Sequence, residues 1–174
     1  MADFFGDYEQ TIDAKRRLPV TSGLRELIPP KDGTNFVLLL GPNARLWLYP
    51  DQYFRRLYRE MKSSDMPNEE FEAMAEYFAK ARVLKPDAQG RVVLPERFLQ
   101  EAQLGLGEVF LVGLDDHIEV WEAQAWMKHQ AEKKADPTVV RNVLSTASRQ
   151  LSRKALEARA REREQEAGQD QEQE

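Results

Sequence analysis

Two short stretches decide how this chain folds: Asp13-Ala-Lys-Arg-Arg17-Leu-Pro-Val20 and Asp87-Ala-Gln-Gly-Arg91-Val-Val-Leu94. Each places an aspartate four residues before an arginine and then continues into a short apolar stretch. A self-similar segment at two places in one chain indicates an internal repeat, and a repeat constrains the fold more than any single element does. The sequence therefore predicts two halves built on one plan.

A β-hairpin is predicted after each motif. In the first half, residues 36–40 and 45–49 are rich in β-forming side chains and flank the turn residues Gly41-Pro42-Asn43. In the second half, residues 109–112 and 118–121 flank a turn at Asp115-Asp116. A short helix that starts with Pro95 separates the second motif from its hairpin. These patterns predict an α+β fold of two pseudo-repeated β units with small helices.

Two helices are predicted between the halves and one after them. The first runs over 51–62 with Asp51 as its N-cap, and the second over 68–82, with apolar residues spaced for one helix face. The third runs over 123–135 and is ended by Asp136-Pro137. We interpret the aromatic stripe on these helices as core or subunit interface, because such stripes more often pack than bind ligands.

The chain after Pro137 has a different composition. Apolar residues follow a four-three-four spacing that suits a short coiled-coil seam, at Val140, Leu144, Ala147 and Leu151. The last residues carry too little apolar surface to fold alone. We expect the domains to be a first repeat at 7–54, connecting helices at 55–82, a second repeat at 83–126, C-terminal helices at 127–156, and a disordered charged tail at 157–174.

Composition excludes several classes of protein. The 174 residues contain no cysteine and carry a net charge of −5, which excludes disulfides, thiolate chemistry and a dominant polybasic arm. The N-terminus has no secretory signal pattern. The longest aliphatic or aromatic run, 36–40, is far shorter than the roughly 20 residues that span a bilayer. We expect a globular protein with no membrane partner.

The search for catalytic chemistry finds no site. His117 follows Asp115 and Asp116, but three consecutive residues on a turn cannot easily converge on one metal ion, and we expect a solvated turn there. His129 has no partner within reach by spacing. No nucleophile, zinc or phosphate-loop motif is present. We therefore expect no enzyme activity, metal, cofactor or small-molecule substrate, and an enzyme using His117 is the weakest hypothesis.

The repeated motif carries the informative charges. Lys15, Arg16 and Arg17 belong to the first copy, and Arg91 with Lys85 nearby belongs to the second. Clustered cations on a turn can meet phosphates or guanine edges, while the aspartate orients the arginine or accepts from a backbone N–H. The alternative is an intramolecular ion pair that only pins the turn. Two copies at matching places favour recognition of a repeating ligand.

With these motifs the chain resembles the MraZ family of bacterial transcriptional regulators, whose two tandem SpoVT-AbrB-type repeats each bear a D-x-x-x-R signature. Further matching segments are Phe5-Gly6-Asp7-Tyr8, Leu46-Trp47-Leu48-Tyr49-Pro50 and Val112-Gly113 leading to Ile118-Glu119-Val120-Trp121, so that the resemblance covers roughly 5–135. It implies a swapped-hairpin β architecture, ring-shaped homo-oligomers, and binding to direct repeats in double-stranded DNA upstream of the division and cell-wall gene cluster, usually as a repressor.

One departure concerns the first turn. Arg16 occupies the position where the family keeps glycine, so we expect the first turn to differ in geometry and not to need positive φ. The predicted DNA-binding residues are Lys15, Arg16, Arg17 and Arg91. The predicted turn-organising residues are Asp13, Asp87 and Gly90.

These observations predict a cytoplasmic, nucleoid-associated regulator that binds DNA. The net negative charge is compatible with this prediction if a ring presents one set of basic turns from each protomer on one face. Several weak contacts then reinforce one another through multivalency. The alternative is a ring-forming interaction or assembly protein in which the Asp–Arg pairs are purely structural.

Overall fold

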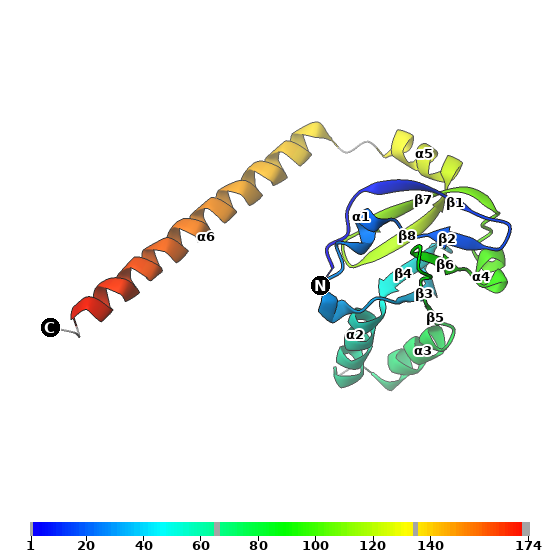
Figure 1. Cartoon of the computed structure of the whole chain (residues 1–174), viewed down its shortest axis with the longest axis horizontal. Coiled ribbons are helices and arrows are strands. Elements are labelled where there is room, and N and C mark those ends of the chain that lie inside the picture. Colours follow the sequence, from blue (N-terminus) through cyan, green and yellow to red (C-terminus); the bar gives the residue numbers. More distant parts are fainter. Residues whose placement is uncertain (1, 65–66, 134–135, 172–174) are drawn as a thin grey trace. The chain divides into compact units, whose positions relative to one another are not determined.

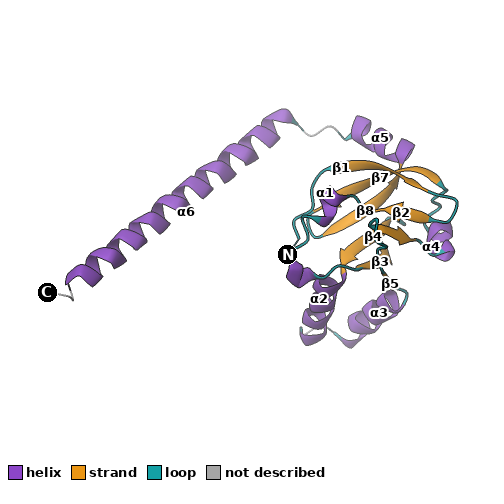
Figure 2. Cartoon of the chain, viewed as in Figure 1, coloured by secondary structure: helices purple, strands orange, loops and turns teal. Residues whose placement is uncertain are grey.

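The computed structural model describes residues 2–64, 67–133 and 136–171 (Figure 1). The chain forms two compact units, 1–129 and 130–174. Figure 2 shows that the first unit combines an antiparallel sheet with short helices and that the second is helical. The predicted α+β class is confirmed.

The two halves of the first unit contain the same series of elements. The first half comprises β1 (Asp7–Ile12), β2 (Arg17–Pro19), α1 (Ser22–Arg25), the 3-10 helix η1 (Pro30–Asp32), β3 (Phe36–Leu40) and β4 (Leu46–Pro50). The second half comprises β5 (Arg82–Leu84), β6 (Arg91–Val93), α4 (Glu96–Glu101), β7 (Gly107–Leu114) and β8 (His117–Glu122). The helices α2 (Asp51–Ser63) and α3 (Asn68–Ala79) connect the halves, and α5 (Ala123–Glu132) and α6 (Pro137–Gln171) follow.

The strands of the two repeats interleave. The larger sheet has the order β1-β7-β8-β4-β3-β5, and β2 pairs with β6 in a separate two-stranded ribbon. If each strand is replaced by its counterpart in the other repeat, the larger sheet keeps the same order. The first strand of each repeat pairs with the hairpin of the other, which is the expected swapped-hairpin arrangement. Neither repeat therefore completes its sheet without the other.

The β2–β6 ribbon joins the two Asp-x-x-x-Arg segments. Its register pairs Arg17 with Val93, Leu18 with Val92 and Pro19 with Arg91. Residues opposite each other in an antiparallel pair share a face, and successive residues alternate between faces. Leu18 and Val92 are fully buried on the inner face, whereas Val93 on the outer face is 52% exposed. The ribbon thus has one apolar face and one face that carries both arginines.

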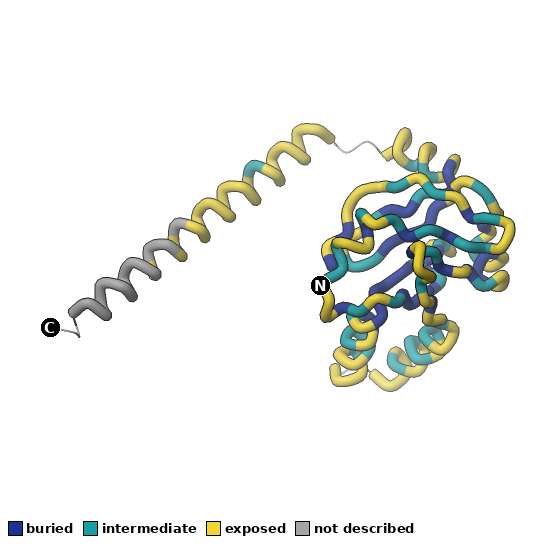
Figure 3. The backbone as a smooth tube through the Cα atoms, viewed as in Figure 1, coloured by how far each residue is buried: buried dark blue, intermediate teal, exposed yellow. Residues whose placement is uncertain are grey.

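Buried residues concentrate on the strands of the first unit (Figure 3), and they form two clusters. On one face the main cluster joins side chains from both repeats, including Leu18, Leu24, Phe36, Leu38, Leu48, Val92, Leu94, Leu111 and Ile118. On the other face a smaller cluster of Val37, Leu39, Tyr49 and Phe54 is covered by aromatic side chains of α2 and α3. Part of the aromatic stripe is therefore core, as predicted.

The second connecting helix is shorter than predicted. It ends at Ala79, and residues 82–84 form β5 in place of the last helical turn. The register pairs Phe36 with Leu84 and Leu38 with Arg82. Pairing with the edge of β3 satisfies backbone groups of that strand, and this tertiary gain outweighs local helical spacing.

Asp51 has a different role from the N-cap that was predicted. It is the first residue of α2, its N-cap is Pro50, and only 3% of its surface is exposed. Its carboxylate accepts from the backbone N and the side-chain Nδ2 of Asn35, at 3.3 and 3.2 Å. Asp51 thus ties α2 to the loop before β3.

The C-terminal unit is helical over a longer stretch than predicted. α6 extends to Gln171, where the sequence analysis expected a disordered tail from residue 157; residues 172–174 lie outside the described part. Arginine, glutamate and alanine are strong helix formers, and Arg153 pairs with Glu157 one turn later at 3.5 Å. Local propensity therefore favours a helix in this segment. Among the described helices, none is long and apolar enough to cross a membrane.

Candidate nucleic-acid interface

The two Asp-x-x-x-Arg turns have the same backbone hydrogen bonds. In the first, Asp13 N donates to Arg17 O at 3.1 Å and Arg16 N donates to Asp13 O at 2.8 Å. In the second, the same bonds join Asp87 to Arg91 and Gly90 to Asp87, both at 2.9 Å. The repeat seen in the sequence is therefore also a repeat of local structure.

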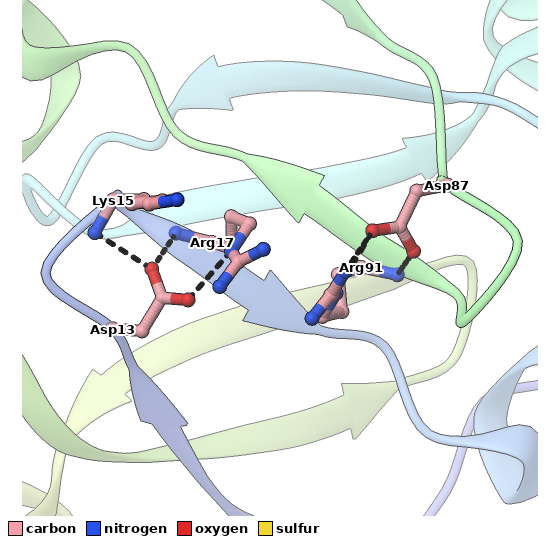
Figure 4. A network of polar contacts seen from close by, with 5 residues as sticks. All are labelled: Asp13, Lys15, Arg17, Asp87 and Arg91. Atoms are coloured by element: carbon pink, nitrogen blue, oxygen red, sulfur yellow. Dashed lines mark hydrogen bonds and ion pairs between the residues drawn. The ribbon is translucent and has the colours of Figure 1, made fainter.

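Each aspartate organises its turn from inside (Figure 4). Asp13 Oδ1 accepts from Lys15 N and Arg17 N at 2.8 and 2.9 Å, and Asp13 Oδ2 accepts from Arg17 Nε at 2.6 Å. Asp87 accepts in the same way from Gln89 N and Arg91 N, both at 2.9 Å, and from Arg91 Nε at 2.8 Å. The aspartate therefore both caps backbone N–H groups and orients the arginine.

These donors favour the charged form of both carboxylates. The backbone N–H and side chain of Arg17 hold the pKa of Asp13 below its usual value. The side-chain hydrogen bond from Arg91, with the backbone N–H of Arg91 and Gln89, lowers the pKa of Asp87 to about 2. Both carboxylates are therefore charged at neutral pH, where each turn keeps its ion pair.

The first turn does not differ in geometry, contrary to the expectation for Arg16. Arg16 has φ +58° and Gly90 has φ +76°, so both turns use the left-handed region at their fourth position. Arginine adopts this region at a cost of roughly 1–2 kcal/mol, which glycine does not pay. The hydrogen bonds of the aspartate and the pairing of the ribbon determine the backbone conformation of the turn. Arg16 therefore adopts positive φ despite its side chain.

The arrangement brings the predicted arginines together. Arg17 and Arg91 extend from neighbouring strands of the ribbon, on its outer face (Figure 4). Their side chains are 32% and 28% exposed, and each pairs with its own aspartate. Lys15 is exposed on the first turn, and Lys85 is exposed just before the second. The structure places the predicted contact residues around one ribbon.

Arg16 makes an ion pair with the other repeat. Its Nη1 lies 3.4 Å from Glu96 Oε2, a residue of α4 in the other repeat. Its Nε is buried and has no hydrogen-bond partner among the described residues. Sequence spacing gave no indication of this contact between the repeats.

His117 is not part of a solvated turn, which corrects the expectation. Its ring stacks on Tyr49 and lies tilted against Trp47, with centroids 5.1 and 4.3 Å away. Its Nδ1 lies 2.8 Å from Asp116 Oδ1, and Nε2 lies 3.9 Å from Glu119 Oε1. Burial lowers the pKa of His117, but the hydrogen bonds and charges of Glu119 and Asp116 outweigh it, so that the pKa is raised.

His129 also has partners that the spacing did not reveal. Its ring lies 4.7 Å from Trp121 and 5.6 Å from Trp126, measured between centroids. Both histidines thus pack against aromatic rings, which is a structural role. In the part of the chain that the structure describes, no group of three or more histidine, aspartate or glutamate side chains is placed to hold a metal ion.

Tandem repeats that exchange strands around a shared ribbon define this chain as a swapped-hairpin β protein. A family model with the description "MraZ protein, putative antitoxin-like" matches residues 4–75 and 77–141. The chain belongs to the MraZ family, as its motifs indicated, and most of α6 lies beyond the matched residues.

Curated relatives cover most of the chain. A protein of Lactiplantibacillus plantarum named "Transcriptional regulator MraZ" is 31% identical over 76% of this chain and 92% of its own length. A protein of the same name from Dehalococcoides mccartyi is 31% identical over 82% of this chain and 96% of its own length. The one from Clostridium acetobutylicum is 27% identical over the same shares.

Substitutions at the fourth position of each turn test whether both turns require positive φ. Arg16→Gly should raise the free energy of unfolding by up to about 1 kcal/mol, because glycine removes the left-handed strain. Gly90→Ala should lower it by about 1–2 kcal/mol, since alanine at φ +76° is strained and its Cβ would lie 2.8 Å from Arg25 Cζ. Urea denaturation of both variants measures the two effects. Equal losses in both variants would contradict the shared geometry.

The His117 cluster predicts a pH dependence of stability. Because the pKa of His117 is raised in the folded chain, its stabilising charge is fully present below its unfolded value of 6.5. This contribution is lost as pH rises through the folded pKa. As the pH rises above 6.5, the denaturation midpoint should therefore fall by more in the native chain than in His117→Gln. Identical pH profiles in the two proteins would rule this out.

Proposed function

We propose that this chain is a sequence-specific transcriptional regulator that binds double-stranded DNA with the outer face of the β2–β6 ribbon. The observation that carries the proposal is the pairing of Arg17 and Arg91 on one face of one ribbon, each held by an aspartate. The names of the curated relatives support the regulatory part.

The dimensions of the ribbon suit a DNA groove. The major groove of B-DNA is about 12 Å wide and admits a two-stranded β-ribbon. Arg17 and Arg91 are diagonal neighbours in the ladder, which separates their backbones by about 7–8 Å. Two guanidinium groups at this separation can reach base edges of the same short site.

The Asp–Arg pairs favour recognition because they fix the orientation of each arginine and leave some of its N–H donors available. Within the guanidinium of Arg17, Asp13 contacts Nε. Within the guanidinium of Arg91, Asp87 contacts Nε and Nη2. A guanidinium has five N–H donors in a planar fork, so both side chains keep donors for a guanine edge. We assign base contacts to Arg17 and Arg91 and phosphate contacts to Lys15 and Arg16.

Because the net charge of the chain is negative, tight DNA binding requires several simultaneous contacts. A net charge of −5 repels the DNA backbone on average and leaves only the local cations to attract it, so that one ribbon alone binds weakly. A homo-oligomeric ring would present one ribbon per protomer to successive direct repeats, and effective concentration would supply the affinity. We propose such a ring, in the cytoplasm and associated with the nucleoid.

The direct repeats upstream of the division and cell-wall gene cluster are the proposed target, with repression as the proposed effect. This part rests on the resemblance of the paired motifs to the family.

Loss of either ribbon arginine should damage binding in a sequence-dependent way. Arg17→Ala and Arg91→Ala should each cost about 1–3 kcal/mol per site on DNA from upstream of the chain's own gene, with less effect on an unrelated duplex. Lys15→Ala should weaken both duplexes alike and lower the slope of log K against log salt by about 0.9.

Fluorescence anisotropy at several salt concentrations measures both quantities, and the matched control is Arg59→Ala, at an exposed position of α2. Full binding by both ribbon variants, with folding intact, would reject the assignment and favour the assembly-protein alternative.

The assembly part predicts a closed homo-oligomer well above a dimer. The sheet ends in the edge strands β1 and β5, and a groove of about 510 Å³ over α2 and α3 is lined by apolar side chains, including Leu57, Met61 and Met74. Such surfaces pair readily with other chains. Light scattering at micromolar protein concentration gives the mass, and a monomer there would contradict the ring.

A further inference from the structure

The two turns differ in one respect that the shared backbone makes clear. At the fourth position the first turn carries the guanidinium of Arg16, and the second turn has Gly90 with no side chain at all. Yet Gly90 is buried. Something from elsewhere in the chain therefore covers the place next to its Cα.

That place is filled by the guanidinium of Arg25, the last residue of α1. A Cβ built on Gly90 would lie 2.8 Å from both Cζ and Nε of Arg25 and 3.0 Å from its Nη2. Arg25 Nε donates to Val20 O at 3.0 Å, and Val20 N donates to Gly90 O at 3.0 Å. Arg25 is thus anchored at the end of the ribbon, against the second turn.

The anchoring leaves most of the guanidinium available. Arg25 is exposed as a whole, and in the described part of the chain its Nη groups donate to no protein acceptor. Arg16, its counterpart on the first turn, lies beside the carboxylate of Glu96. The second turn therefore has a guanidinium that is held by one backbone bond and is not paired with an acid.

A cleft opens beside this guanidinium. It has a volume of about 580 Å³ and is lined by Arg25 and Lys85, with Asp87, Thr34 and Asn35 among its other side chains. The carboxylate of Asp87 is already satisfied by Gln89 N, Arg91 N and the Arg91 side chain, which offsets its repulsion of an anion. Two cations that line one cleft are suited to bind a phosphate group.

We propose that Arg25, together with Lys85, binds a backbone phosphate of DNA next to the second turn, and so supplies from α1 the cation that Gly90 lacks. The inference rests on the proposed DNA-binding function. A ribbon that lies in the groove approaches the sugar–phosphate backbone at its ends, where Arg25 is anchored, while its outer face meets the bases. Arg25 thus sets affinity and register, and Arg17 and Arg91 read the sequence.

The test compares Arg25→Gln with Arg25→Lys in the full-length chain, on the upstream duplex and on an unrelated duplex. Arg25→Gln should lower the slope of log K against log salt by about 0.9 and weaken both duplexes by the same factor. Arg25→Lys keeps the charge and should retain the slope. Arg59→Gln, with the same charge change on α2, should have the smaller effect on both.

The outcomes separate the inference from the function on which it rests. If Arg25→Gln leaves the slope unchanged while Arg91→Ala still loses binding, the phosphate contact is rejected and DNA binding stands. If Arg91→Ala and Arg17→Ala also bind fully, the proposed function is rejected as well. Equal losses in Arg25→Gln and Arg25→Lys, with a lower unfolding midpoint in both, would show a purely structural role on Gly90.

Discussion

The structure depends on a shortage of strand partners within each repeat. The first strand of a repeat has no neighbour in its own half, because β3 and β4, or β7 and β8, already pair as a hairpin. An unpaired buried strand costs free energy for every backbone group that lacks a bond. Exchange of β1 and β5 between the halves removes this cost. It also brings β2 and β6 side by side, so that the ribbon that carries Arg17 and Arg91 forms as the sheet is completed.

The sequence predicted the local plan well, because repeated residues imply repeated conformation. Both hairpins and the connecting helices follow from patterns within each half, whereas the swapped-hairpin class was implied by the resemblance of the paired motifs to the family. What spacing could not predict are contacts between distant segments. Residues 82–84 form a strand because they pair with the edge of β3. Asp51 accepts a hydrogen bond from Asn35 and so links α2 to the loop before β3. His117 lies against Trp47, a residue of the other repeat.

The candidate site shows the same division. The aspartates and arginines were predicted from two copies of one motif, and the aspartates do orient the arginines. The glycine rule failed at Arg16, because tertiary pairing imposes a left-handed residue that local preference disfavours. The sequence carries no signal for the role of Arg25, since its partner Gly90 lies far along the chain and has no side chain of its own.

The unequal turns give the ribbon a direction. Two identical halves would read a DNA box equally well from either end. Here one end carries Lys15 and Arg16, and the other carries Gln89 and Gly90 with Arg25 behind it. A protomer that binds through such a ribbon distinguishes the two orientations of its box. In the proposed ring, neighbouring protomers related by rotation would all point the same way, and the DNA boxes that fit them would run head to tail rather than as mirrored pairs.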